Sequence, residues 1–354
     1  MLRCLGCFAL ASLDLAQEIR ETRESSWADA AVEWIGDFAL RAGSDRLAAT
    51  AAAEEVAELR ELVRLAQIAY EDDTDTVSSL LPDGLTLRDA GRERAVWFMA
   101  QRRRTVFLVF RGTSEWKDIF ADMQVLPDLA GKHRLHGGFA SHVSKDGNPI
   151  LEAALAALPK GCELHILGHS LGGAVALALL ASGQLPRGLG HVDVTMIGSP
   201  KVFHGVAPSV RELGARRVKL LVNHGDIVPR LLGNEKVDVS RYLKQLRQLE
   251  IRDEDLPALA DYCHPAGLEL VVLRGAAALK PSPAFHDRIW LDPTALAGTK
   301  RDPFTDHLMT EYMQSLDSLD PSRFGRSGLV QTLRDLGTVF SDETCPDRSA
   351  RGCG

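Results

Sequence analysis

The feature that most constrains the fold of this chain is a glycine-rich turn of sequence G-H-S-L-G-G at residues 168–173. The apolar run before it, 163–167, is typical of a buried strand, and the alanine- and leucine-rich run after it, 171–182, is typical of a buried helix. Glycine lets a strand and a helix fold back closely on each other, because it has no β-carbon to clash. The sequence therefore predicts a strand, a sharp turn and a helix in direct succession.

A serine in such a turn is a candidate nucleophile, although the bare G-x-S-x-G string also occurs by chance in purely structural turns. Ser170 would project from the carboxyl end of the strand, with Gly168, His169 and Gly172 completing the elbow. The backbone N–H of Leu171, at the start of the predicted helix, and the helix dipole favour developing negative charge. This context favours a serine hydrolase of the α/β-hydrolase type over a structural turn.

An α/β-hydrolase supplies its acid and its base after the nucleophile, in the order serine, acid, histidine. Asp226 follows a strand-like run at 219–222 in a glycine-containing loop, where open α/β sheets assemble their sites. Asp193 is the competing acid, but it lies inside or at the start of a predicted strand. The base must come from the three histidines that follow Asp226, which are His264, His286 and His307. Position alone leaves these three open, with His307 favoured because it stands at the start of the last predicted helix.

Strand-like and helical patterns alternate along the rest of the chain. Helices are expected at 45–70, 139–158 and 306–316, and strands at 95–100, 105–110, 163–167, 192–197, 218–222 and 268–273. This alternation predicts an α/β fold with a central, mostly parallel sheet flanked by helices. We expect a helical N-terminal extension at 1–44, a catalytic domain at 45–320 and a polar, flexible tail at 321–354.

Composition excludes several classes of partner. The chain has 41 basic and 48 acidic residues, and its formal net charge of −7 makes it a poor nucleic-acid binder. No apolar run approaches the roughly 18 residues that a transmembrane helix needs. Cys4 and Cys7 have a C-x-x-C spacing, but no second pair follows, so neither a metal nor another cofactor is expected. The short apolar stretch at 5–13 is a weak secretion signal, so an intracellular location is favoured.

Several further motifs resemble the class 3 lipases, the family of the fungal triacylglycerol lipases. They are found in the expected order over roughly residues 60–320: 65–70, 110–113, Trp116 with Asp122, 135–139, 168–173, 198–202, 223–230, 262–267, and His307 with Tyr312. The resemblance implies that Ser170, Asp226 and His307 form a catalytic triad, and that Thr113 donates its backbone N–H and its hydroxyl to the oxyanion. One departure, Pro-Ala-Gly at 265–267 in place of the usual Val-Gly, affects a structural strand rather than the triad.

The resemblance also implies a lid between Thr113 and the 135–139 motif. Lid candidates are the apolar side chains Trp116, Ile119, Phe120 and Met123, and the alternative is an ordinary packed surface helix. The expected function is hydrolysis of acylglycerol or phospholipid esters through an acyl-enzyme, with lipid esters as substrates and transient contact with a membrane or lipid-droplet surface. The alternative is a lipase-like protein that serves as a non-catalytic binding or signalling scaffold.

Overall fold

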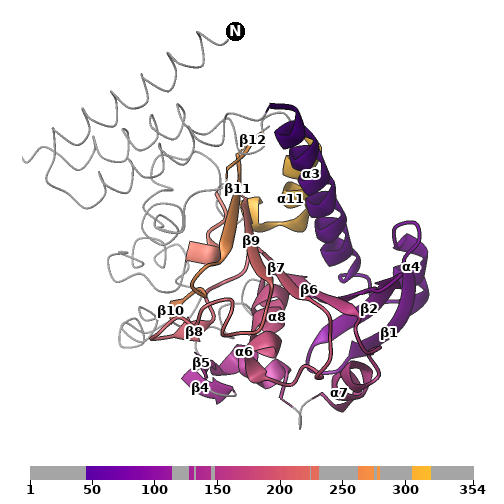
Figure 1. Ribbon diagram of the computed structural model, residues 1–354, viewed down its shortest axis with the longest axis vertical. Helices are drawn as coiled ribbons and strands as arrows, with labels where there is room; N and C mark the ends of the chain where they lie inside the picture. Colours follow the sequence, from indigo (N-terminus) through magenta and orange to yellow (C-terminus); the bar gives the residue numbers. More distant parts are fainter. Residues whose placement is uncertain are drawn as a thin grey trace, which may run out of the picture.

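The computed structural model describes residues 45–113, 127–130, 133–144, 148–223, 225–230, 262–274, 277–279 and 305–319 (Figure 1). The predicted lid side chains Trp116, Ile119, Phe120 and Met123 lie outside the described residues. The same holds for His286, the extension at 1–44 and the tail at 321–354.

An eight-stranded sheet forms the centre of the described part of the chain, in the order β1-β2-β3-β6-β7-β9-β11-β12. Neighbouring strands from β3 through β11 pair in parallel, and the pairs at the two edges are antiparallel. This confirms the predicted α/β fold with its mostly parallel sheet. The strands are β1 (Thr86–Arg92), β2 (Val96–Arg102), β3 (Thr105–Phe110), β6 (Glu163–His169), β7 (Val192–Ile197), β9 (Arg217–Asn223), β11 (Glu269–Arg274) and β12 (Ala277–Leu279).

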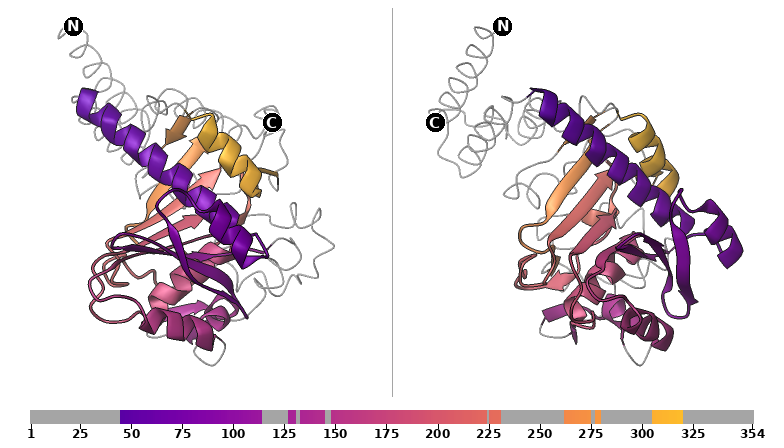
Figure 2. Two further views of the ribbon diagram at one scale, coloured as in Figure 1. Left: turned by 90° about the vertical axis from the view of Figure 1, so that its right-hand side faces the viewer. Right: turned by 45° about the vertical axis from the view of Figure 1, so that its right-hand side comes forward.

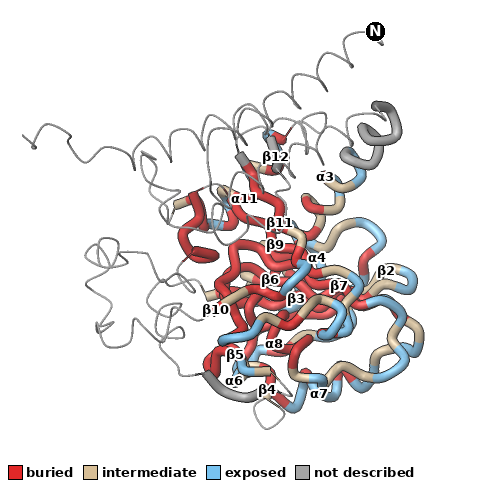
Figure 3. The backbone as a smooth tube through the Cα atoms, turned by 60° about the vertical axis from the view of Figure 1, so that its left-hand side comes forward, coloured by how far each residue is buried: buried red, intermediate tan, exposed pale blue. Residues whose placement is uncertain are grey.

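Helices cover both faces of this sheet (Figures 1 and 2). On one face, α8 (Leu171–Ser182) is buried along almost its whole length, which explains its continuous run of alanine, valine and leucine (Figure 3). The helices α6 (Gly137–His142) and α7 (Pro149–Ala156) share its hydrophobic cluster. On the other face, α3 (Asp45–Ile68) and α11 (Met309–Asp317) pack together in a second cluster. The short helix α4 (Thr74–Leu80) connects α3 to β1.

The segment 139–158, expected to be largely helical, contains two helices, α6 and α7, rather than one continuous helix. Pro149 begins α7, and the side chain of Asn148 caps the new helix by accepting a hydrogen bond from Leu151 N at 3.2 Å. A proline lacks the N–H that a helix interior requires and is favoured in the first turn, so it starts a helix here rather than continuing one.

A second, four-stranded sheet was not predicted. Its order is β10-β8-β5-β4, from the strands β10 (Tyr262–Cys263), β8 (Phe203–His204), β5 (His133–His136) and β4 (Pro127–Ala130). Strands of two to four residues are too short to show a period-two pattern, and three of the four come from loops between larger elements. The sequence therefore carries little local signal for this sheet.

Ion pairs attach helix α3 to the edge of the sheet at which the parallel strands begin. Its carboxylates Glu55, Glu58 and Glu61 recur every three residues and so lie on one face. They pair with Lys219 Nζ at 3.0 Å, Arg217 Nη2 at 2.6 Å and Arg102 Nη1 at 2.5 Å, respectively. Lys219 is only 1 % exposed, so its charge is compensated inside the protein rather than by water.

The same helix also holds α11. Arg60 Nε donates a hydrogen bond to the carbonyl oxygen of Leu316 at 3.0 Å, and its Nη2 donates to that of Leu319 at 3.2 Å. These carbonyls belong to the last turn of α11 and the residues after it, where an α-helix lacks intrahelical donors. Arg60 thus caps α11 and fixes it against α3.

Candidate active site

Ser170 occupies the sharp turn between β6 and α8. Its backbone has φ 54° and ψ −125°, and among the described residues only Arg103 is another non-glycine residue with positive φ. Such a conformation costs about 1–3 kcal/mol and persists only where the surrounding structure imposes it. The Ser170 N–H donates to the Ile197 carbonyl at 2.8 Å, and its buried Oγ has no hydrogen-bond partner among the described residues.

The glycines of the elbow stand where the strand and the helix come closest. A β-carbon on Gly168 would lie 2.5 Å from the Gly172 carbonyl oxygen, and one on Gly172 would collide with the Phe110 carbonyl oxygen. A β-carbon on Gly173 would collide with Ser199 Oγ. The turn therefore depends on the absence of these β-carbons.

The residues after β3 lie beside the elbow. Strand β3 runs parallel to β6 and ends with Phe110 paired to Gly168. A β-carbon placed on Gly112 would lie 3.2 Å from Ser170 Cβ, so the loop that carries the half-buried Thr113 begins next to the serine. Leu171 is the first residue of α8, and its N–H is one of those that a helix leaves without an intrahelical acceptor.

Asp226 and His307 form a buried pair. Asp226 follows β9 and is fully buried, and His307 is the last residue of a 3₁₀ helix, η7 (Thr305–His307), just before α11. Both carboxylate oxygens lie 2.9 Å from His307 Nδ1. The carboxylate also accepts hydrogen bonds from Val228 N at 2.9 Å and from the Tyr312 hydroxyl at 2.6 Å. A carboxylate at Nδ1 holds the ring proton there, which leaves Nε2 as the basic nitrogen.

This pair and the serine elbow share the carboxyl edge of the sheet. His169, the neighbour of Ser170, has its ring centroid 4.5 Å from that of His307. Gly198, which follows β7, has a φ of 56°. A β-carbon there would lie 2.5 Å from Asp226 Oδ2 and 3.1 Å from His307 Nδ1. The structure thus brings the predicted residues Ser170, Asp226 and His307 to one place.

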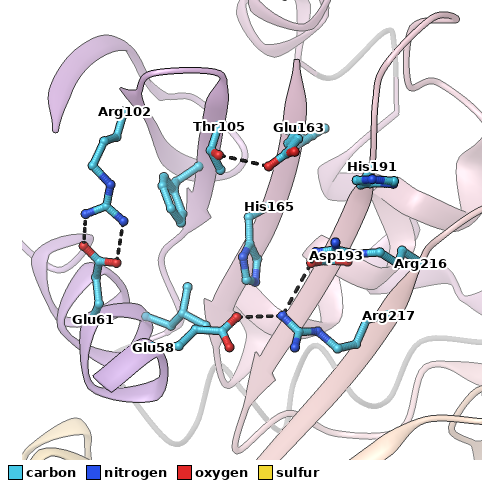
Figure 4. A pocket seen from close by; sticks show the side chains of 13 residues that line it. Glu58, Glu61, Arg102, Thr105, Glu163, His165, His191, Asp193, Arg216 and Arg217 are labelled. Atoms are coloured by element: carbon cyan, nitrogen blue, oxygen red, sulfur yellow. Dashed lines mark hydrogen bonds and ion pairs between the residues drawn. The ribbon is translucent and has the colours of Figure 1, made fainter. Parts of the chain in front are cut away.

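The competing acid Asp193 lies at the opposite edge. It is near the start of β7, where its carboxylate accepts hydrogen bonds from Arg216 and from Arg217 (Figure 4). These side chains, together with Glu58, help to line a cavity of about 210 Å³ at the amino ends of the strands. Asp193 therefore pairs with arginines at the edge of the sheet opposite the serine elbow. The alternative base His264 is buried beside β10 in the small sheet.

The match with known proteins covers the centre of this site. Residues 107–236 match the family model described as Lipase (class 3). This segment belongs to the class 3 lipase family. It runs from within β3 past the 3₁₀ helix η2 (Val228–Arg230), so it includes Thr113, Ser170 and Asp226 but not His307.

Solved lipase structures resemble this chain at low identity. The lipase of Rhizopus microsporus var. chinensis is 20% identical, with 72% of this chain and 86% of that chain covered and a TM-score of 0.49. The Lip2 lipase of Yarrowia lipolytica is 19% identical, with coverages of 65% and 82% and a TM-score of 0.44. For the Rhizomucor miehei lipase propeptide complex the identity is 22%, the TM-score is 0.41, and the match covers 50% of this chain and 62% of that one, less than two thirds of its length. No curated protein matches this chain.

Sequence reasoning did not assign a site role to Tyr70, Gly198, Asn223 or Tyr312. The Asn223 amide Nδ2 donates to the Asp306 carbonyl at 3.1 Å, and its backbone N–H donates to the Tyr312 hydroxyl at 2.9 Å. Burial and the neighbouring Asp226 charge raise the pKa of Tyr312, so its hydroxyl remains a donor. The available signals were weak: a Gly-Ser-Pro segment directly after a buried strand, an asparagine at a strand end, and tyrosines on the two flanking helical segments.

Two further findings concern cofactors and membranes. Within the described ranges, no cluster of three or more histidine, cysteine, aspartate or glutamate side chains is arranged to hold a metal ion. Among the helices of those ranges, none is both long enough and apolar enough to cross a bilayer.

Proposed function

We propose that this class 3 lipase is a serine carboxylic ester hydrolase in which Ser170 is the nucleophile, His307 the general base and Asp226 the orienting acid. The observation that carries the proposal is the buried Asp226–His307 pair at the same sheet edge as a serine held at positive φ. The catalytic domain in this proposal spans residues 45–320. No cofactor is required by the scheme.

The reaction begins with attack of Ser170 Oγ on the ester carbonyl carbon while His307 Nε2 takes the hydroxyl proton. The negative charge of the tetrahedral intermediate falls on the former carbonyl oxygen. The backbone N–H of Leu171, together with the N–H and hydroxyl of Thr113, stabilises that charge. Asp226 offsets the positive charge that the imidazole acquires.

Collapse of the intermediate breaks the bond to the alcohol, which leaves with the proton that His307 returns. The acyl group is then bonded to Ser170. A water molecule attacks this acyl-enzyme and gives a proton to His307, the bond between the acyl carbon and Ser170 Oγ breaks, and His307 returns the proton to that oxygen as the fatty acid is released. The family points to lipid esters, so we propose acylglycerols or phospholipids as substrates, reached by transient contact with a membrane or lipid-droplet surface.

The test is hydrolysis of p-nitrophenyl esters of increasing chain length by the wild type and by Ser170→Ala. Removal of a triad serine lowers kcat on the order of 10⁶-fold. A fluorophosphonate probe should label the wild type at Ser170 and leave the variant unlabelled. Equal hydrolysis rates for the two proteins would contradict the enzymatic proposal and favour a non-catalytic scaffold.

A further inference from the structure

Two side chains that the reaction scheme does not use lie between its catalytic groups. The Tyr70 hydroxyl, just beyond the end of α3, lies 2.7 Å from His169 Nδ1. On the other side of the same ring, His169 Nε2 lies 2.8 Å from the backbone carbonyl oxygen of His307. Tyr70 is 99 residues from His169, which is 138 residues from His307, so these contacts join distant parts of the chain.

The direction of these hydrogen bonds follows from their chemistry. A carbonyl oxygen only accepts, so His169 must carry a proton on Nε2 and donate it to His307. Burial lowers the pKa of His169 well below its usual value, so the ring is neutral and its Nδ1 is an acceptor. The Tyr70 hydroxyl must therefore donate to Nδ1, and burial raises its pKa and keeps it protonated.

The tyrosine oxygen has a second neighbour in the loop after β3. A β-carbon on Gly112 would lie 2.5 Å from it, so the loop backbone passes directly beside the hydroxyl. Glycine is required here because any side chain would separate the loop from the tyrosine. The hydrogen bonds therefore run in one direction, from Tyr70 to His169 and from His169 to the carbonyl of His307, and Gly112 lies against the tyrosine end.

These contacts involve residues within or directly beside each part of the proposed active site: the oxyanion loop, the nucleophile and the base. Gly112 precedes Thr113, His169 precedes Ser170, and the last acceptor is the backbone of His307 itself. We propose that Tyr70 and His169 are positioning residues that hold the oxyanion loop, the nucleophile and the base in fixed relative positions. This inference rests on the proposed function, because it assigns these two residues to the same reaction.

The decisive variant is Tyr70→Phe, which keeps the ring and removes the hydroxyl. Its control is Tyr262→Phe, because the buried Tyr262 hydroxyl has no hydrogen-bond partner among the described residues and belongs to the small sheet. Fluorophosphonate titration counts functional sites, and hydrolysis of a p-nitrophenyl ester gives kcat per site and KM. We expect Tyr70→Phe to lower kcat per site about 10- to 100-fold, because displacement of catalytic groups by about 1 Å has effects of that size. KM should change less than twofold, and Tyr262→Phe should match the wild type.

A second pair of variants separates the two ends of the chain of hydrogen bonds. In His169→Gln the amide nitrogen reaches the position of Nε2 and can still donate to the His307 carbonyl. In His169→Asn the shorter side chain reaches only the position of Nδ1, so it keeps Tyr70 as its partner and loses His307. We expect kcat per site to be higher in His169→Gln than in His169→Asn.

A merely structural role would lower Tm or the number of titrated sites in Tyr70→Phe and leave kcat per site at the wild-type value, which overturns the inference. Equal kcat per site in the two His169 variants would overturn the link to His307. Failure of the wild type to react with the probe at Ser170 would instead contradict the proposed function, so the two failures are distinguishable.

Discussion

Gly198 offers the sharpest perturbation of the site, because one added methyl group meets three of its polar side chains. Its β-carbon would lie 2.5 Å from Asp226 Oδ2, 2.8 Å from the Tyr312 hydroxyl and 3.1 Å from His307 Nδ1. Ordinary van der Waals contact begins near 3.4 Å, so in Gly198→Ala the Asp226 carboxylate must move away from the new β-carbon by about 0.9 Å. A shift of about 1 Å in catalytic geometry costs on the order of 10²-fold in rate. We therefore expect kcat to fall about 100-fold.

The matched control is Gly183→Ala, at the C-terminal cap of α8. Gly183 also has positive φ, 72°, but a β-carbon there meets no heavy atom within 4 Å. Both variants carry the backbone penalty of about 1–2 kcal/mol for a side chain in the left-handed region. Only Gly198→Ala should lose activity, measured as kcat on a p-nitrophenyl ester beside urea unfolding of each protein. Equal kcat values in the two variants would refute the argument that Gly198 makes room for the Asp226–His307 pair.

Three further outcomes are expected. Thr113→Val should lower kcat about 10²- to 10³-fold by removing an oxyanion donor, and urea unfolding should be nearly unchanged; full kcat would remove Thr113 from the oxyanion site. Tyr312→Phe should lower the free energy of unfolding by about 1.5–3 kcal/mol, because it removes a hydrogen bond to a buried carboxylate, and an unchanged urea midpoint would contradict this. Burial lowers the pKa of His165 to about 4, so protonation of the unfolded chain should cost about 2 kcal/mol of stability between pH 7 and pH 5. His165→Asn should lose that share of the pH dependence, and an identical slope in both proteins would count against it.

The sign of the His165 effect follows from the folded state's preference for the neutral ring. The unfolded chain binds a proton below about pH 6.5, whereas the folded protein resists it until about pH 4. Stability therefore falls as the pH decreases through this window. The neutral ring lies 2.9 Å, at its Nε2, from the Thr195 hydroxyl, and stacks on Phe107.

The sequence predicted best where a local pattern determines the structure. The helix 171–182 and the strand 192–197 were predicted with the bounds that the structure shows, because their residues are mostly apolar and glycine or polar turns flank them. The small sheet and the break between α6 and α7 were missed. Short strands depend on partners far along the chain, and a proline inside a helical pattern can be read either as a kink or as a new start.

The prediction of the site shows the same contrast between local sequence patterns and contacts made by residues far apart in the chain. Motif context and chain order nominated Ser170 and Asp226, because those rules act along the sequence, and the family resemblance selected His307 among three candidate histidines. The contacts of Tyr70, Gly198 and Tyr312 depend on tertiary packing. Tyr312 is 86 residues from the carboxylate to which it donates, and no spacing rule predicts that contact. The elements that support the site were therefore visible only in three dimensions.

The ion pairs of α3 limit how the chain can be divided. The family match begins at residue 107, after α3, yet Lys219 inside the match is neutralised by Glu55 outside it. A fragment that starts at 107 would leave a buried ammonium without its carboxylate and would expose the apolar face that α3 covers. It would also lose Arg60 from the end of α11 and Tyr70 from the side of His169. The segment that matches the family model is thus not a separable unit, and any shortened or fused version of this protein must retain the helix that begins at Asp45.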